Sequence, residues 1–117
     1  MTYVDGFVAA VPAANKEAYR AHAAKAAVVF KEHGALSVVE CWGDDVPEGK
    51  INSMHTAVMR KDDEVVLFSW TIWPDKDARN AGWEKVMTDP RMQPENNPMP
   101  FDGKRMIYGG FETILDV

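Results

Sequence analysis

Hydrophobic residues dominate four stretches of the chain in the manner of β-strands. These strand-like runs cover residues 3–11, 35–42, 65–73 and 106–116. The run VVLFSWTIW at 65–73 is the strongest indication, because its residues are β-branched or aromatic almost throughout. Pro12 closes the first run, and an Asp-Gly turn at 102–103 precedes the last one. The pattern therefore predicts four strands spread along the chain.

Two other segments repeat apolar residues every three to four positions, as a helix with one buried face does. The first covers residues 16–33, follows Asn15 as a candidate N-cap and stops before Gly34. The second covers residues 75–88 and ends at Asp89, because the residue before a proline is forced out of the helical region. We expect one helix after the first strand and another before the last strand.

The segment MHTAVMR, residues 54–60, is predicted to form a further short strand. The order is then β-α-β-(short β)-β-α-β, which is the split βαβ plan. We predict an α+β, ferredoxin-like βαββαβ fold in one domain spanning residues 1–117, with a four-stranded antiparallel sheet and two helices on one face. The first and last strands are neighbours in this plan. Gly6 and Gly110, two weak points in strand-like sequence, are therefore expected to lie close together.

The strand at 65–73 is apolar on both faces. One face carries Val66, Phe68, Trp70 and Ile72, and the other carries Val65, Leu67, Thr71 and Trp73. Two helices cover only one face of such a sheet, and a large apolar surface left in water favours association. The simplest cover is the same sheet of a second copy, so we expect a homodimer.

Composition and charge narrow the classes of partner. The formal net charge is −5 and no Lys/Arg cluster is longer than a pair, which disfavours nucleic-acid binding. No apolar run approaches the roughly 20 residues of a membrane-spanning helix, so no membrane association is expected. Cys41 is the only cysteine, so no intrachain disulfide forms. The chain opens without a basic leader sequence, and we expect a cytoplasmic protein.

Six short motifs recur in this order in one bacterial family. They are YVDGF, HGAL, VEC, FSW, MPFDGKRM and YGGF, and they span most of the chain. The sequence thereby resembles the YbaA-like family of unknown function, within the dimeric α/β-barrel superfamily. The resemblance implies the ferredoxin-like fold and a dimer. It implies no reaction, because no reaction is established for the family. The wider superfamily includes cofactor-independent monooxygenases, haem-degrading and haem-using enzymes, and lactone isomerases.

Carboxylates within strands are the first candidates for chemistry. Asp5, Glu40 and Glu112 stand among apolar strand residues, where a carboxyl group can have a raised pKa and act as a general acid or base. Tyr108 shares a strand face with Glu112. We therefore take Asp5, Tyr108 and Glu112 as candidate catalytic residues and Glu40 as a candidate ligand-binding residue. The alternative is that the glutamates lie on an exposed rim and that Asp5 bonds backbone near Gly6.

The histidines do not form a metal-binding pattern. His22 and His33 share a helix face but are separated by about 16 Å along the axis, too far for one metal ion. His22 borders the apolar stripe of its helix and is a further candidate catalytic residue, as a proton shuttle or a haem-type ligand. The alternative is a structural histidine. With no metal-binding motif in the chain, we expect neither a metal nor a cofactor.

Aromatic and arginine side chains are candidates for holding a ligand. The aromatic candidates for lining an apolar pocket are Trp42, Trp70, Trp73, Trp83 and Tyr108, and of the tryptophans Trp70 and Trp83 are assigned to the site. Arg79, Arg91 and Arg105 are possible anion anchors, of which Arg79 is assigned to the site. The alternative places the tryptophans in the core and the dimer interface, and the arginines in surface ion pairs.

The leading hypothesis is a homodimer whose sheet-lined cavity holds a small, partly apolar molecule, with acid–base chemistry that needs no metal. The proline-rich segment 89–105 is expected to act as a lid over that cavity. The first alternative is a non-catalytic structural or interaction dimer, in which the same aromatics build only the interface. The second is a haem-handling or monooxygenase-like protein.

Overall fold

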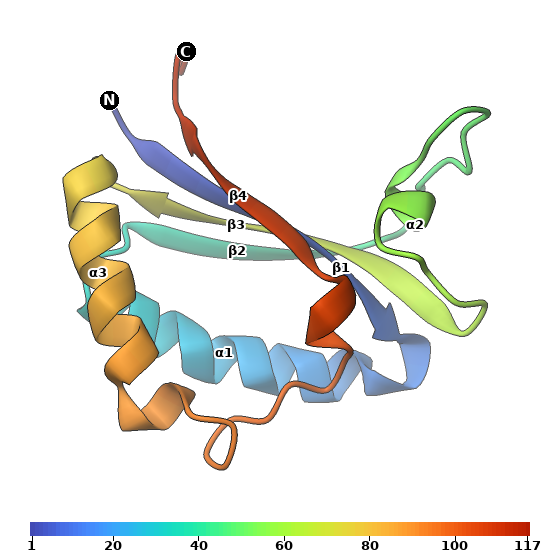
Figure 1. Ribbon diagram of the computed structural model, residues 1–117, viewed down its shortest axis with the longest axis horizontal. Coiled ribbons are helices and arrows are strands. Elements are labelled where there is room, and N and C mark those ends of the chain that lie inside the picture. Colours follow the sequence, from blue (N-terminus) through green and yellow to red (C-terminus); the bar gives the residue numbers. More distant parts are fainter.

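The computed structural model describes residues 1–117 and contains one four-stranded sheet with two long helices (Figure 1). The strands are β1 (Tyr3–Pro12), β2 (Ser37–Trp42), β3 (Glu64–Trp73) and β4 (Ile107–Glu112). The α-helices are α1 (Lys16–Glu32), α2 (Met54–Ala57) and α3 (Lys76–Thr88). Short 3-10 turns η1 (Ala13–Asn15), η2 (Pro90–Met92) and η3 (Gly103–Arg105) complete the order. No helix is long and apolar enough to cross a membrane.

The sheet confirms the predicted ferredoxin-like plan. Its strand order is β2-β3-β1-β4, and each neighbouring pair is antiparallel. Helices α1 and α3 cover one face, as Figure 1 shows. The core lies between them and the sheet, around Trp73, which is fully buried against Phe30 and Val86, and around Leu67, which packs against Tyr19 and Ala23. Alternation along the strands sends every second side chain into this layer.

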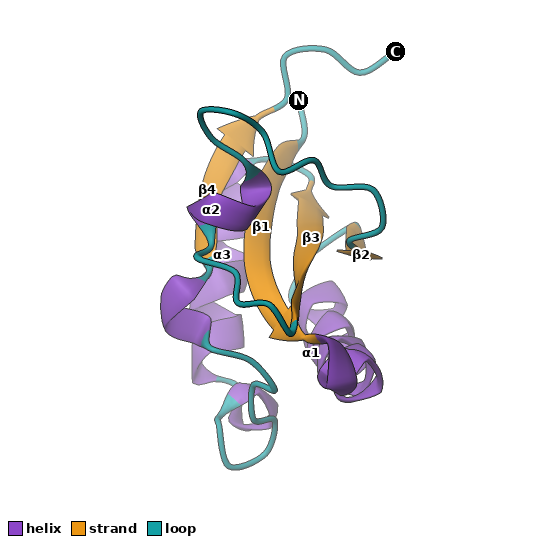
Figure 2. Cartoon of the chain, turned by 90° about the vertical axis from the view of Figure 1, so that its right-hand side faces the viewer, coloured by secondary structure: helices purple, strands orange, loops and turns teal.

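The expected short strand at 54–60 is wrong, because part of that segment forms the helix α2. Ser53 accepts a hydrogen bond from the backbone N–H of Thr56, and the Thr56 side chain accepts one from the backbone of Ser53, so a capping box starts the helix. After the helix, Val58 is buried against Ala10 and Val66, on the opposite side of the sheet from α1 and α3. Figures 1 and 2 show α2 and its flanking loops as a small lobe at one end of the sheet.

Most predicted boundaries hold, and the differences have local causes. Asn15 precedes α1, but its side chain donates to the Pro100 carbonyl instead of capping the helix. Gly34 follows α1 with φ of 112°, a conformation that glycine adopts at a helix C-terminus. Asp75, expected inside the second helix, is its N-cap and accepts from the Ala78 N–H. The last strand ends at Glu112, four residues earlier than predicted.

The glycines of β1 and β4 lie close together on neighbouring strands, as expected. Gly6 lies opposite Gly109, and Gly110 lies opposite Asp5. A Cβ added to Gly110 would lie 2.5 Å from the Tyr3 hydroxyl oxygen and 3.0 Å from Nη2 of Arg79. Gly110 is therefore a packing device that lets a tyrosine and an arginine pass close to the backbone of β4.

The sheet face opposite α1 and α3 is apolar and only partly covered. Phe68 and Phe111 are 43% and 59% exposed there, and Trp70 lies beside Phe68 with ring centroids 5.5 Å apart. Cys41 is half-buried on this face. The chain is a slab of 38 × 38 × 21 Å with a radius of gyration of 14.7 Å, against about 13 Å for a compact domain of this length.

Candidate functional site

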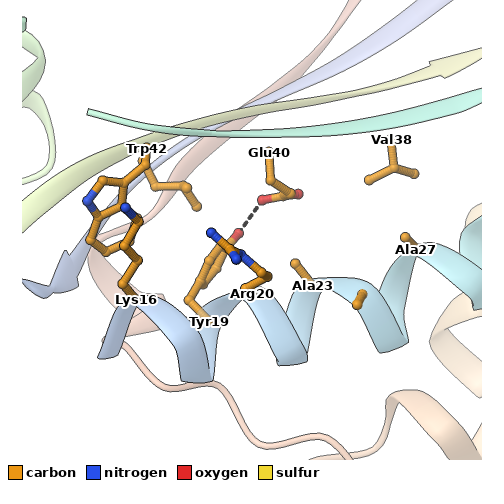
Figure 3. A pocket seen from close by; sticks show the side chains of 10 residues that line it. Lys16, Tyr19, Arg20, Ala23, Ala27, Val38, Glu40 and Trp42 are labelled. Atoms are coloured by element: carbon orange, nitrogen blue, oxygen red, sulfur yellow. Dashed lines mark hydrogen bonds between the residues drawn. The ribbon is translucent and has the colours of Figure 1, made fainter. Parts of the chain in front are cut away.

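A groove of about 320 Å³ lies between α1 and β2, at the edge of the sheet (Figure 3). Ten side chains line it: Lys16, Tyr19, Arg20, Ala23, Ala24, Ala27, Val38, Glu40, Trp42 and Leu67. Seven of the ten are hydrophobic. The groove is therefore an apolar hollow with a few polar groups, which is the usual composition of a small-molecule site.

The groove results from the side-chain sizes on the two elements that form it. Alternation in β2 directs Val38, Glu40 and Trp42 toward α1, while Val39 and Cys41 face the other side of the sheet. On the facing surface of α1, all three groove-lining positions after Arg20 are alanines: Ala23, Ala24 and Ala27. Because alanine fills little volume, the helix and the strand leave a space between them.

Glu40 projects into the middle of the groove and accepts a hydrogen bond from the buried Tyr19 hydroxyl (Figure 3). Glu40 is partly open to solvent, but its contact with the apolar wall removes enough water to raise the pKa of the carboxyl group, and the hydrogen bond from Tyr19 acts in the opposite direction. Burial, followed by the adjacent Glu40, also raises the pKa of Tyr19, so the phenol keeps its proton at neutral pH. Glu40 and Tyr19 together place a carboxylate and a hydrogen-bond donor of fixed orientation on the otherwise apolar wall of the groove.

Two cations stand at the mouth of the groove. Lys16 lies with its Nζ 5.7 Å from the centre of the Trp42 ring, a distance at which a cation is attracted to the ring face. Arg20 follows one turn later on α1, and its only ion pair is with the exposed Glu17, at 3.5 Å. Both cations are exposed, so they remain accessible to a charged group at this end of the groove.

Three predicted site residues meet in a second place, outside the groove. Asp5 is 2% exposed and accepts hydrogen bonds from Nε1 of Trp73 at 2.9 Å and Nε1 of Trp83 at 2.8 Å. Arg79 donates from Nε and Nη2, the shortest distance being 2.7 Å. The sequence thus identified Asp5, Arg79 and Trp83, but their contacts saturate the carboxylate and fasten α3 to the sheet.

The other predicted strand residues are not brought together. Tyr108 is 74% exposed on the edge strand β4, with its ring centroid 6.3 Å from that of Phe7. Glu112 is exposed at the end of the same strand. Trp70 lies on the sheet face away from α1 and α3. None of these three lines the groove, whereas Glu40 and the candidate pocket aromatic Trp42 do.

His22 is held by the proline-rich segment. Its Nδ1 lies 3.0 Å from Oδ1 of the buried Asn97, and Nδ2 of Asn97 donates to the His22 carbonyl at 3.1 Å. The His22 ring also packs edge-on against Phe101, and burial lowers its pKa. In Figure 1 the segment runs along α1 on the side away from the sheet, and no residue of 89–105 lines the groove. The segment 89–105, expected to act as a lid, therefore does not cover this groove.

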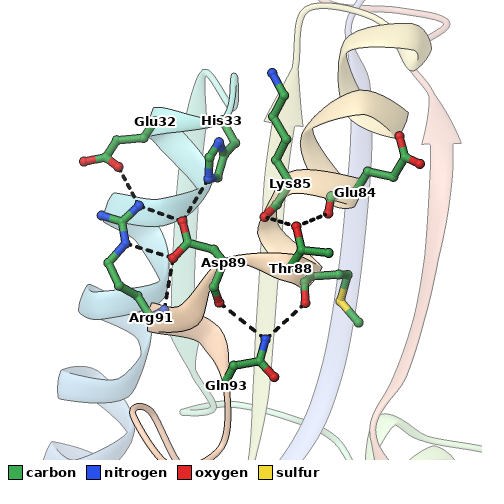
Figure 4. A network of polar contacts seen from close by, with 9 residues as sticks. Glu32, His33, Glu84, Lys85, Thr88, Asp89, Arg91 and Gln93 are labelled. Carbon is green, nitrogen blue, oxygen red and sulfur yellow. Dashed lines mark hydrogen bonds and ion pairs between the residues drawn. The ribbon is translucent and has the colours of Figure 1, made fainter.

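A polar network joins the ends of α1 and α3 (Figure 4). Asp89 lies 3.0 Å from Nε2 of His33 and accepts from Nη2 of Arg91 at 2.8 Å, and Arg91 also pairs with Glu32 at 2.6 Å. Arg91 holds the pKa of the Asp89 carboxyl group far below its usual value. Arg105 is likewise paired, with the buried Glu64, at 2.7 Å. These arginines fasten elements together.

Sequence reasoning missed most of the groove. The sequence patterns single out none of Tyr19, Lys16 and Arg20 as site residues. The sequence does contain an indication of the Tyr19–Glu40 contact. A buried tyrosine hydroxyl needs a hydrogen-bond partner, and Glu40 is the one acidic residue in the strand that follows the helix. No three His, Cys, Asp or Glu side chains converge as metal ligands in residues 1–117.

The family model described as protein of unknown function, DUF1428, matches residues 2–103. Over 116 residues the chain is 59% identical to the uncharacterized protein YbaA of Escherichia coli strain K12, covering 99% of both chains, and equally similar to YbaA of Shigella flexneri.

Among solved structures, a mutant of SnoaB, a cofactor-independent oxygenase from Streptomyces nogalater, superposes with a TM-score of 0.57 and 19% identity. The match covers 99% of this chain and 94% of that one. A likeness at this level of identity extends to the fold alone.

Proposed function

The chain belongs to the DUF1428 family, whose function is unknown, and we propose that it binds a small, partly apolar molecule in the groove between α1 and β2. The observation that carries the proposal is the apolar groove with one carboxylate, Glu40, directed into it and bonded by Tyr19. A polar group that charges reluctantly on an otherwise apolar wall is a common feature of ligand sites.

We further propose that the protein is a homodimer. The support is the apolar face with Phe68, Trp70 and Phe111, which no element of the same chain covers except at the α2 end. The flat shape and the large radius of gyration agree with half of a two-sheet assembly. A symmetric pairing of this face buries each copy's apolar surface with the other's.

Acid–base chemistry at Glu40 is part of the same proposal. A carboxyl group with a raised pKa takes up a proton more readily than an ordinary glutamate does, and the hydrogen bond from Tyr19 fixes its orientation. SnoaB is a cofactor-independent oxygenase on the same fold, which supports a chemistry carried by side chains alone. In this role Glu40 touches the ligand and Tyr19 positions Glu40.

A thermal-shift screen of small aromatic, lactone and haem-like compounds tests the binding proposal. Ala27→Leu fills the groove from α1, whereas Ala21→Leu places the same bulk on an exposed part of the helix. Hits should raise the melting temperature of the wild type and of Ala21→Leu but not of Ala27→Leu. Hits that stabilise both variants equally, or a screen without hits, would contradict binding in the groove.

A non-catalytic interaction dimer is the second candidate, because Asp5 is fully engaged by protein donors and Glu112 is exposed. On that hypothesis the aromatics serve packing, and Glu40 titrates without consequence for any ligand. The test is a compound that binds in the groove. If Glu40→Gln lowers its affinity while sedimentation shows an unchanged dimer, the non-catalytic interaction dimer is contradicted.

A further inference from the structure

Resting on the proposed homodimer, we propose that a short C-terminal arm of each copy packs against the partner copy. The arm is residues 113–117, which follow β4, and its docking surface is the α2 lobe, residues 43–63, which comprises α2 and its flanking loops. The lobe stands at one end of the open sheet face, and the arm leaves from the other end (Figure 1). A symmetric dimer contains this contact twice.

The arm is apolar, fixed at its base and open to water along the rest of its length. The Thr113 backbone N–H donates to the Thr2 carbonyl at 3.2 Å, and the two threonine hydroxyls are hydrogen-bonded at 2.8 Å. Beyond this tie, Ile114, Leu115 and Val117 are all exposed. Figures 1 and 2 show the arm projecting past the end of the sheet. Exposed apolar residues on a tethered segment are suited to a partner surface.

The α2 lobe also presents apolar side chains that its own chain leaves uncovered. Ile51, Met54 and Met59 are exposed there. The lobe itself is firmly attached, because Val58 is fully buried and the Met59 carbonyl accepts a hydrogen bond from Nη1 of Arg105 at 2.9 Å. A surface that is already fixed loses little conformational entropy when a partner binds to it.

The position of the lobe limits how two copies can pair face to face. Val58 contacts Ala10 and Val66, so the lobe stands on the open face where β1 ends and β3 begins. Facing sheets lie about 10 Å apart, which is the thickness of a single helix. Two lobes at the same end would therefore hold the sheets apart. A two-fold axis that runs across the strands puts the lobes at opposite ends, each beside the partner's arm.

The arm is long enough to make the contact. An extended segment of the length of residues 113–117 spans roughly 17 Å, against a spacing of about 10 Å between facing sheets. It can therefore leave the edge strand of its own sheet and reach the layer that the partner's lobe occupies. The pairing covers the exposed apolar residues of both segments, which lie at opposite ends of a single chain's open face.

A mixed-label NMR experiment tests the contact directly. One copy carries ¹³C-labelled Ile and Leu methyl groups and the other is unlabelled, so isotope-filtered NOEs report only contacts between copies. We expect cross-peaks from Ile114 and Leu115 of the labelled copy to the methyl group of Met54 or Met59 of the partner copy. Cross-peaks to Phe111 or to no partner residue at all would overturn the docking of the arm on the lobe.

Charge substitutions test the same contact by affinity. Ile114→Asp/Leu115→Asp should raise the dissociation constant of the dimer about 10-fold or more, because it places two charges in an apolar contact. Met54→Lys/Met59→Lys should weaken the dimer likewise, and mixing these two variants should give a heterodimer in preference to either homodimer. The control Met87→Asp/Met99→Asp changes exposed residues outside both segments and should leave the dissociation constant unchanged. No preference for the heterodimer would contradict the contact.

Failure of this inference is distinguishable from failure of the homodimer. If sedimentation shows that the wild type is a monomer, both proposals are wrong. If the wild type is a dimer that Ile114→Asp/Leu115→Asp leaves equally tight, the sheet faces pair but the arm does not dock on the partner's lobe.

Discussion

Single residues of one type have different roles in this protein, as the three strand carboxylates show. Asp5 is buried and saturated by donors, Glu40 faces an apolar groove, and Glu112 is exposed. The sequence singled out all three, because each interrupts an apolar strand. It could not rank them, because the donors to Asp5, such as Trp73 and Trp83, lie about 70 positions away along the chain.

Asp5→Asn should destabilise the protein by about 3 kcal/mol or more, because it leaves the Arg79 guanidinium without its buried counter-charge and weakens two indole hydrogen bonds. Urea denaturation monitored by circular dichroism measures the loss. Asp116→Asn, at an exposed position, is the matched control and should change the free energy of unfolding by less than about 0.5 kcal/mol. A similar stability for both variants would contradict the role given to Asp5.

At the scale of elements, hydrophobic patterning predicted the four strands and both long helices, because packing faces are local properties of the sequence. It failed at residues 54–60, where Ser53 and Thr56 start a helix through a capping box that outweighs the strand-like composition. It predicted that Gly6 and Gly110 lie close together but not which residues face each other, because strand register depends on pairing between β1 and β4 at opposite ends of the chain.

The adjacent glycines of β4 should respond oppositely to alanine. Gly110→Ala should cost about 1–3 kcal/mol, because the new Cβ collides with the buried Tyr3 side chain and with Arg79. Gly109→Ala should be neutral or slightly stabilising, because its Cβ makes an ordinary contact with the Phe111 ring and alanine lowers the entropy of the unfolded chain. Thermal unfolding of the two variants checks this, and a larger loss at Gly109 would refute the register.

The network that joins α1 to α3 should make stability depend on pH. Because Arg91 and His33 lower the folded-state pKa of Asp89, its contribution is complete well above the unfolded-state value of 3.8 and is lost as pH falls below it. The difference in urea midpoint between wild type and Asp89→Asn should therefore be largest near neutral pH and shrink between pH 5 and pH 3. A difference that grows on acidification would contradict the assignment (Figure 4).

For the whole molecule, the strand that is apolar on both faces predicted an uncovered surface, and one face of the sheet is indeed largely open in a single chain. The groove was beyond sequence reasoning, since it depends on how far α1 stands from β2 and on which side chains are small there. Local patterns identify faces, whereas a cavity depends on the distance between two faces.

Phe68→Glu should convert a dimer into a monomer, because it places a charge in the centre of the apolar sheet face. Sedimentation equilibrium should give twice the chain mass of 13.1 kDa for the wild type and the single mass for the variant. Met87→Glu is the control, since Met87 is 66% exposed on α3, on the other side of the sheet. A wild type that stays monomeric at micromolar concentration would rule out the proposed dimer.

The most direct test of the central claim, that the groove between α1 and β2 is a ligand site, is an NMR titration of the ¹⁵N-labelled protein with the compound that raises the melting temperature most in the thermal-shift screen. The account predicts that amide shift changes concentrate in residues 16–27 of α1 and 38–42 of β2, and that Ala27→Leu removes them. Shift changes centred on the open sheet face or on α2, or none at saturating ligand, would contradict it.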